Sequence, residues 1–180
     1  MFELTGTLEA SESEAIVRYR FVNSSNEIVY AAQHVTDRKR NLQPASAYAA
    51  LSHDGRRLDL LLGTSPVPTD RDVEFAVPAI YVKLSVGAET TGEIRMPIPV
   101  LEWDAYHPPA RGPKDVKVEV REATLTLEIV PEKTLRWIQP AKEPENCWLL
   151  GGTPTPAKLS LSSDVPIVVC KRHDDILRRS

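Results

Sequence analysis

Apolar and polar residues alternate along much of this chain, and the longest alternating stretch runs from Val116 to Pro131. Strict alternation predicts a β-strand with one buried and one solvated face. One parity holds Val116, Val118 and Val120, and the other holds Ala123, Leu125, Leu127 and Ile129. The apolar set changes face across Arg121 and Glu122, which requires a β-bulge or a bend between two sheets. We therefore expect one long bent strand, or two collinear strands, crossing the middle of an antiparallel β-sandwich.

Two shorter alternating stretches, residues 2–10 and 15–21, predict the first two strands. The second ends at the turn-forming run 23–26, and we expect residues 28–35 to return as its hairpin partner. A helix is the competing interpretation. Ser11 and Glu14 match a capping box, and residues 15, 16, 19 and 22 have helical spacing. Arginines that alternate with aromatic and β-branched residues favour the strand.

Further strands are expected on both sides of the central stretch. Residues 47–52 and 58–62 flank His53-Asp54-Gly55-Arg56, and Asp-Gly predicts a hairpin with a type I′ turn. The others are residues 80–86, 93–96, 135–138, 148–150, 159–161 and 165–170. Pro97 and Pro99 place their segment at a sheet edge or outside the sheet. Residues 101–113 are expected to form a long loop.

About ten short strands, in a chain whose 15 prolines leave little room for long helices, predict an all-β antiparallel sandwich. We expect a single domain over residues 1–170 and a polar tail over 171–180. The run Tyr19-Arg20-Phe21-Val22-Asn23 and the strand-turn-strand segment 84–99, which ends in Pro-x-Pro, resemble bacterial single-domain proteins with immunoglobulin- or fibronectin-III-like sandwiches. The resemblance covers residues 1–110 and implies an immunoglobulin-like fold. It brings no catalytic residues, and the antibody-type Cys…Trp…Cys spacing is absent.

Composition indicates an ordinary globular chain. Its 180 residues suffice to bury about two-thirds of the unfolded surface. A formal net charge of −3, with both signs interspersed, gives no basic field for nucleic acid. No apolar run reaches membrane-spanning length. Residues 1–5 do not look like a signal peptide, although a chain from which one had been removed would look the same. The cytoplasm is the default expectation.

Few residues suggest a metal or cofactor site. Cys147 and Cys170 fit buried free thiols, with a disulfide between them left open, and neither belongs to a C-x-x-C zinc pair. His173-Asp174-Asp175 and His53-Asp54 are metal-capable, but neighbours on an extended chain point apart, so we interpret both as solvated. His34 is expected to be a half-buried histidine. Familiar catalytic and phosphate-binding motifs are absent, and we expect no metal and no cofactor.

The densest polar-aromatic patch is the candidate ligand-binding site: Glu102, Trp103, Asp104, Tyr106 and His107. Such side chains can line a pocket, and loops often carry function. The structural alternative is that Trp103 and Tyr106 close the open end of the sandwich. The sequence thus predicts a non-catalytic module that binds a protein or peptide partner through loops or a sheet edge, with no nucleic acid and no membrane. The alternative is a small enzyme or metal-binding protein that uses Glu102, Asp104 and His107.

Overall fold

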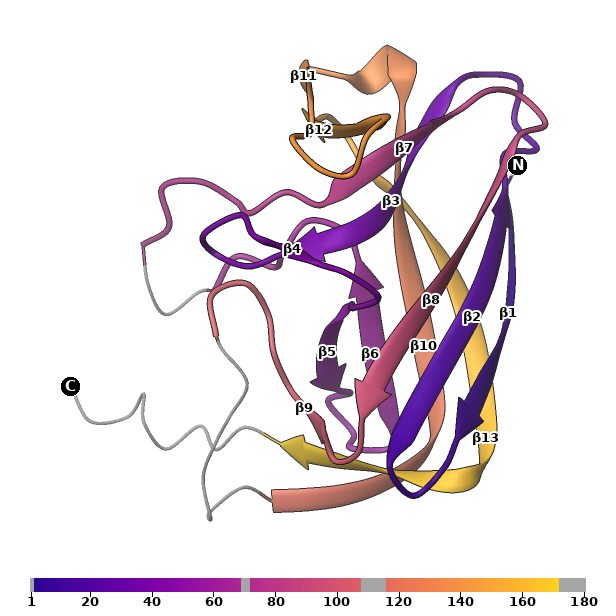
Figure 1. Ribbon diagram of the computed structural model, residues 1–180, viewed down its shortest axis with the longest axis vertical. Coiled ribbons are helices and arrows are strands. Elements are labelled where there is room, and N and C mark those ends of the chain that lie inside the picture. The colour runs from indigo at the N-terminus through magenta and orange to yellow at the C-terminus, as the bar shows by residue number, and fades with distance from the viewer. Residues whose placement is uncertain (1, 69–71, 108–115, 172–180) are drawn as a thin grey trace.

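The computed structural model describes residues 2–68, 72–107 and 116–171, and these contain thirteen strands and one 3-10 turn, Glu132–Thr134 (Figure 1). A three-stranded sheet has the order β1-β2-β8, with β1 (Glu3–Ala10), β2 (Glu14–Val22) and β8 (Glu89–Pro97). The other ten strands form a second sheet along the path β11-β12-β7-β3-β10-β13-β9, from which β4, β5 and β6 branch. Its strands are β3 (Val29–Thr36), β4 (Leu42–Gln43), β5 (Tyr48–Leu51), β6 (Arg57–Leu62), β7 (Ile80–Leu84), β9 (Val100–Leu101), β10 (Val116–Pro131), β11 (Trp137–Pro140), β12 (Cys147–Gly151) and β13 (Thr155–Lys171). The all-β prediction is confirmed for the described residues.

β10 is the long central strand that the alternation predicts, with the predicted boundaries. On one side it pairs with β13, and the register shifts between Val120 and Glu122, where the apolar parity changes. The guanidinium of Arg121 donates a hydrogen bond to the Asp164 carbonyl across this shift. β10 and β13 bend together: the first part of β10 and the last part of β13 run sideways at the bottom of Figure 1, and the remainder of both strands stands upright. The bulge therefore keeps Val120 and the later apolar set, including Leu125, in one core.

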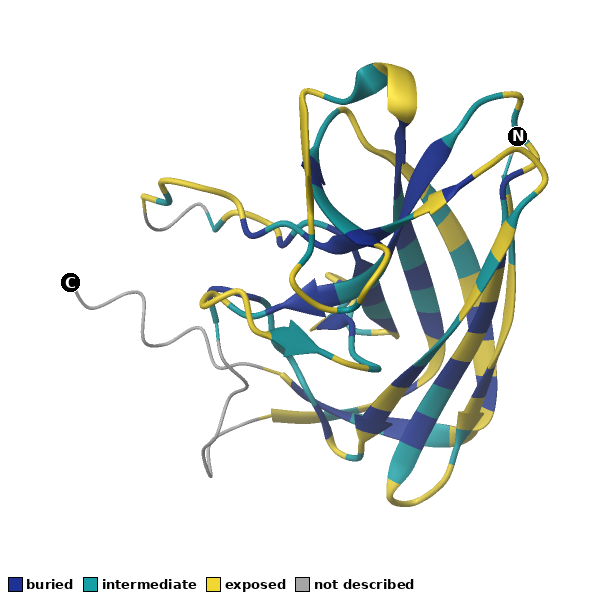
Figure 2. Cartoon of the chain, turned by 45° about the horizontal axis from the view of Figure 1, so that its top comes forward, coloured by how far each residue is buried: buried dark blue, intermediate teal, exposed yellow. Residues whose placement is uncertain are grey.

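Both sheets contribute to that core. Val17, Phe21 and Ile94 from the three-stranded sheet belong to the same buried cluster as Leu125 and Ile167 from the larger sheet. Buried residues alternate with exposed or half-buried ones along β2 and in the second half of β8 (Figure 2). Burying an aliphatic or phenylalanine side chain stabilises a fold by roughly 1.5–3 kcal/mol, so this shared cluster is what holds the sheets together.

The predicted pairing of the second strand is wrong. Residues 14–22 do form a strand, and the Ser11 hydroxyl accepts the Glu14 N–H in the turn before it. Its partners are β1 and β8, however, whereas β3 lies in the other sheet. The buried side-chain amide of Asn23 explains this, because it donates to the carbonyls of Glu27 (2.9 Å) and Leu84 (3.1 Å). Residues 23–28 and 85–88 are thus two linked crossings between the sheets.

The β5–β6 hairpin is confirmed, but its turn is not type I′. Gly55 has a φ of +71°, and Asp54 is not in the left-handed region. Instead, the Asp54 carboxylate accepts hydrogen bonds from the Ser52 hydroxyl (2.6 Å) and the Arg56 N–H (3.2 Å). The turn is closed by these side-chain contacts together with one glycine.

A purely antiparallel sandwich is also wrong. β6 pairs in parallel with β10, and β9 pairs in parallel with β13, so the larger sheet is mixed. Long connections precede both parallel pairings, as parallel neighbours require. The two strands expected at 159–161 and 165–170 are parts of β13.

Several smaller expectations have structural answers. Cys147 and Cys170 are buried and free, and burial raises the pKa of Cys147. Pro97 ends β8, an edge strand of its sheet, as its backbone predicts. No helix among the described residues has the length and apolarity to cross a membrane. Apart from Lys171, the expected tail lies outside the described residues, as does the loop beyond His107 up to Val116.

Candidate functional site

The first predicted site residues, Glu102 and Trp103, contact the β5 strand. Trp103 exchanges backbone hydrogen bonds with Ala49 at 2.9 and 3.1 Å, and its ring meets the Tyr48 ring edge-on at 5.1 Å between centroids. The Glu102 carboxylate accepts the Leu51 N–H at 2.6 Å. These contacts extend the β5 edge by one irregular segment.

The remaining three residues form a turn. The Asp104 carboxylate accepts the backbone N–H groups of Tyr106 (2.7 Å) and His107 (2.8 Å), and lies 2.9 Å from His107 Nδ1. The buried Tyr106 side chain leaves the turn: its hydroxyl accepts the Val77 N–H at 3.0 Å and donates to the Phe75 carbonyl at 3.1 Å. The five predicted residues thus contact three different segments, and these contacts favour structural roles for Trp103 and Tyr106.

The other metal-capable residues lie apart. His34 is half-buried on β3, and burial lowers its pKa. His53 and Asp54 occupy the β5–β6 turn, and His173-Asp174-Asp175 lies outside the described residues. Within the ranges that the structure describes, no three His, Cys, Asp or Glu side chains gather closely enough to hold a metal ion.

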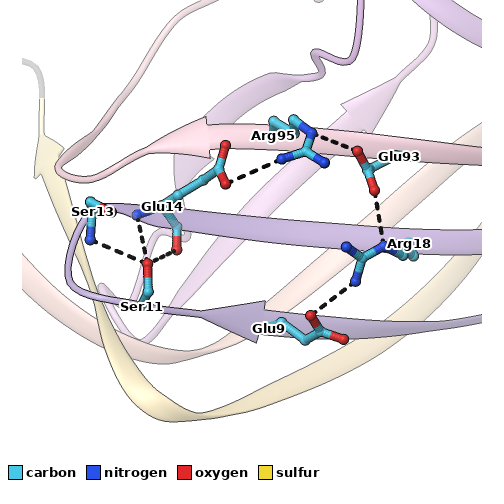
Figure 3. A network of polar contacts seen from close by, with 7 residues as sticks. All are labelled: Glu9, Ser11, Ser13, Glu14, Arg18, Glu93 and Arg95. Carbon is cyan, nitrogen blue, oxygen red and sulfur yellow. Dashed lines mark hydrogen bonds and ion pairs between the residues drawn. The ribbon is translucent and has the colours of Figure 1, made fainter.

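The outer face of the three-stranded sheet carries a chain of ion pairs (Figure 3). It runs from Glu9 through Arg18, Glu93 and Arg95 to Glu14, with distances of 2.6–3.3 Å. A shallow hollow of about 550 Å³ lies beside these charges. Exposed ion pairs are worth roughly 0–1 kcal/mol each, and here opposite charges already neutralise one another. This face therefore has no excess of positive or negative charge that would select a charged partner.

A second cavity, of about 780 Å³, combines features of a binding site, and we call it the β11 cleft. Its volume lies within the roughly 300–1,000 Å³ typical of ligand pockets. It is lined by the turn after β3, by the segment between β6 and β7 together with Tyr81 of β7, by the end of β10, and by the β11–β12 hairpin with the residues that follow it. The side chains that matter for its chemistry are Arg40, Phe75, Tyr81, Glu128, Trp137 and Gln139.

Glu128 supplies the fixed negative charge of the cleft. Its Oε2 accepts the Thr64 N–H at 2.5 Å, and its Oε1 accepts the hydroxyls of Tyr81 (2.9 Å) and Thr64 (3.1 Å). All three donors are neutral. In the described part of the chain, no cationic side chain forms an ion pair with Glu128. The carboxylate is therefore held in place without being neutralised.

The topology of β10 explains where this carboxylate lies. β6 runs beside β10 as far as the Leu62–Leu127 pair, and β3 takes over from Ile129. Glu128 lies between the last β10 residue that pairs with β6 and the first that pairs with β3. Gly63 begins the segment that leaves β10 after β6. A Cβ on Gly63 would lie only 2.4 Å from Glu128 Oε2, so a larger residue would displace the carboxylate.

Exposed aromatic residues stand beside this charge. Phe75 is 69% and Trp137 48% exposed, although both are large and apolar. Trp137 is seated on Gly151, where an added Cβ would lie 2.3 Å from the indole Nε1. The indole thus packs directly on the backbone of Gly151, and any side chain there would displace it. Aromatic residues exposed at a cavity are typical anchors for a bound partner.

The predicted loop lies behind this cleft and supports its wall. Tyr106 binds the backbone of Phe75 and Val77, and the Val77 carbonyl accepts the Ser65 N–H at 3.0 Å. Ser65 Oγ in turn accepts the Ala105 N–H at 3.2 Å. Sequence reasoning missed the cleft itself. The sequence signals for the cleft were Gly63-Thr64, directly after the strand predicted at 58–62, and Trp137, within the short strand predicted at 135–138.

The polar groups of the cleft include a carboxylate and a phenol. Burial raises the pKa of Tyr81 and the neighbouring Glu128 carboxylate adds to this, so the phenol stays protonated and acts as a donor. A fixed carboxylate and a protonated phenol can orient a bound polar group. Comparison of the chain with known protein families, with characterised proteins and with solved structures gives no match, so its function rests on this geometry.

Proposed function

We propose that this protein is a non-catalytic binding module that holds a protein or peptide partner in the β11 cleft. The observation that carries the proposal is the pairing of exposed Phe75 and Trp137 with the anchored Glu128 carboxylate in one cavity of about 780 Å³. The scaffold would be a β-sandwich of the immunoglobulin-like class. Its two parallel pairings, β6 with β10 and β9 with β13, would then be departures from that class.

A peptide suits the cleft because of its surroundings. β11 is the terminal strand of its sheet, and all four of its residues are exposed. Extended peptides bind beside sheet edges and place alternate side chains into adjacent pockets. Pro140 cannot donate from the β11 backbone, which limits continued strand addition along this edge. Side-chain contacts in the cleft would therefore supply most of the specificity.

The test is selection of displayed random peptides on the wild-type protein, followed by titration of the selected peptides in solution. We expect Phe75→Ala and Trp137→Ala each to weaken binding at least tenfold. Val86→Ala is the matched control, because Val86 is 58% exposed and does not line the cleft. A selection without enrichment, or peptides that bind the Trp137→Ala variant as tightly as wild type, would contradict the proposal.

A further inference from the structure

We infer that the partner places an arginine side chain in the β11 cleft, with its guanidinium on the Glu128 carboxylate. This inference rests on the proposed function and specifies the chemistry of the bound peptide.

The charge of Glu128 is the first argument. A carboxylate surrounded by protein is stabilised best when a cation accompanies its hydrogen bonds. Oε2 receives a single recorded hydrogen bond, from Thr64, although a carboxylate oxygen has two lone pairs. Since no described cation pairs with Glu128, a basic group from outside would both use that capacity and balance the charge.

The aromatic lining favours arginine over lysine. A guanidinium is planar, so it can stack on an aromatic face while its edge donates to a carboxylate. Phe75 and Trp137 offer exposed rings in the same cavity as Glu128. An ammonium group is a compact, strongly hydrated charge that uses such a ring less well.

Arg40 favours a peptide over a small cation. It lines the same cleft from an exposed turn, where its φ is +63°. A small polyamine would bring two or more positive charges close to the Arg40 guanidinium, whereas one arginine side chain brings a single charge. An extended peptide also brings backbone carbonyl oxygens, to which the Arg40 guanidinium can donate. The cleft therefore suits a basic side chain carried on a neutral backbone.

The experiment compares two acetylated, amidated tripeptides, Gly-Arg-Gly and Gly-citrulline-Gly, titrated into the ¹⁵N-labelled protein. Citrulline keeps the shape of arginine but replaces the guanidinium with a neutral urea. The reporter is the indole N–H signal of Trp137, assigned with Trp137→Phe. We expect the arginine peptide to shift this signal with at least tenfold higher affinity than the citrulline peptide. Glu128→Gln should abolish that preference.

Glu119→Gln is the matched control, because it removes the same charge from an exposed position on the same strand. The peptide comparison on the wild-type protein stays informative even if Glu128→Gln destabilises the fold. Equal binding of both peptides at the Trp137 signal would overturn the arginine inference and leave cleft binding intact. No shift of cleft signals with either peptide, or shifts confined to another face, would overturn both.

Discussion

Replacing Tyr106 with phenylalanine tests whether the 102–107 segment holds the wall of the β11 cleft. The hydroxyl of Tyr106 joins this turn to the segment between β6 and β7, since it accepts the Val77 N–H and donates to the Phe75 carbonyl. The ring is 7% exposed, so phenylalanine fills the same space and only the two hydrogen bonds are removed.

The magnitude follows from where each partner lies. Val77 is also 7% exposed, so its N–H loses its recorded acceptor in a buried setting, which costs about 1–3 kcal/mol. Phe75 is exposed, so its carbonyl can turn to water and contributes little. We therefore expect the free energy of unfolding to fall by about 2 kcal/mol. For a chain of this size that lowers Tm by about 4–8 °C.

Urea titration followed by tryptophan fluorescence measures the loss, and Tyr19→Phe is the control. Tyr19 is comparably buried at 4% exposure, and within the described residues no hydrogen bond is recorded for its hydroxyl. Its removal should cost less than about 0.5 kcal/mol, as substitutions without a lost interaction usually do. If Tyr106→Phe is no more destabilising than Tyr19→Phe, the hydroxyl does not hold the cleft wall.

Three further outcomes are expected. Leu127→Ala should cost about 2–5 kcal/mol in urea titrations, because Leu127 is fully buried, whereas the partly exposed Thr126→Ala should cost much less; equal losses would refute the assigned faces of β10. Trp103→Ala should cost about 3 kcal/mol, because it removes the packing on Tyr48, and a near-neutral result by thermal unfolding would make Trp103 a surface anchor instead. Burial lowers the pKa of His34, so the unfolded chain binds this proton first as pH falls below about 6.5. Stability should therefore decline from that pH down to the folded pKa, and a His34→Gln variant measured across the same range should show a smaller decline.

The faces of the strands could be predicted from the sequence because they depend on local alternation. The β10 boundaries, and the change of apolar parity across Arg121, follow from the side-chain period of two. β13 was harder. Its Asp164 and Pro166 interrupt the alternation, yet the strand continues through them because the bulge lies opposite Arg121.

Strand partners could not be predicted in the same way. The apolar pattern of β3 shows which of its residues are buried, but several other strands could pair with β3 and bury those residues equally well. What directs β3 into the other sheet is the buried Asn23 side chain, whose contacts with Glu27 and Leu84 join residues that lie far apart in the sequence. Within the sequence, an asparagine beside two serines indicates only a turn.

The candidate site was missed for a related physical reason. Glu128 occupies an outward position of β10, and sequence alone cannot separate it from any solvated acid on a strand. It becomes part of a cleft only because β6 leaves β10 after Leu62 and β3 begins to pair at Ile129. The aromatic-rich loop attracted attention instead, and Tyr106 does contact the cleft wall from behind.

The exchange of β6 for β3 beside β10 connects the stability of the fold to the proposed binding site. β10 keeps β13 along one side and exchanges β6 for β3 on the other, so the core continues while one outward position opens. The chain leaves β10 at Gly63, and the Glu128 carboxylate accepts a hydrogen bond from the Thr64 N–H. The Glu128 carboxylate thus accepts a hydrogen bond from the backbone that follows β6, and it also lines the β11 cleft.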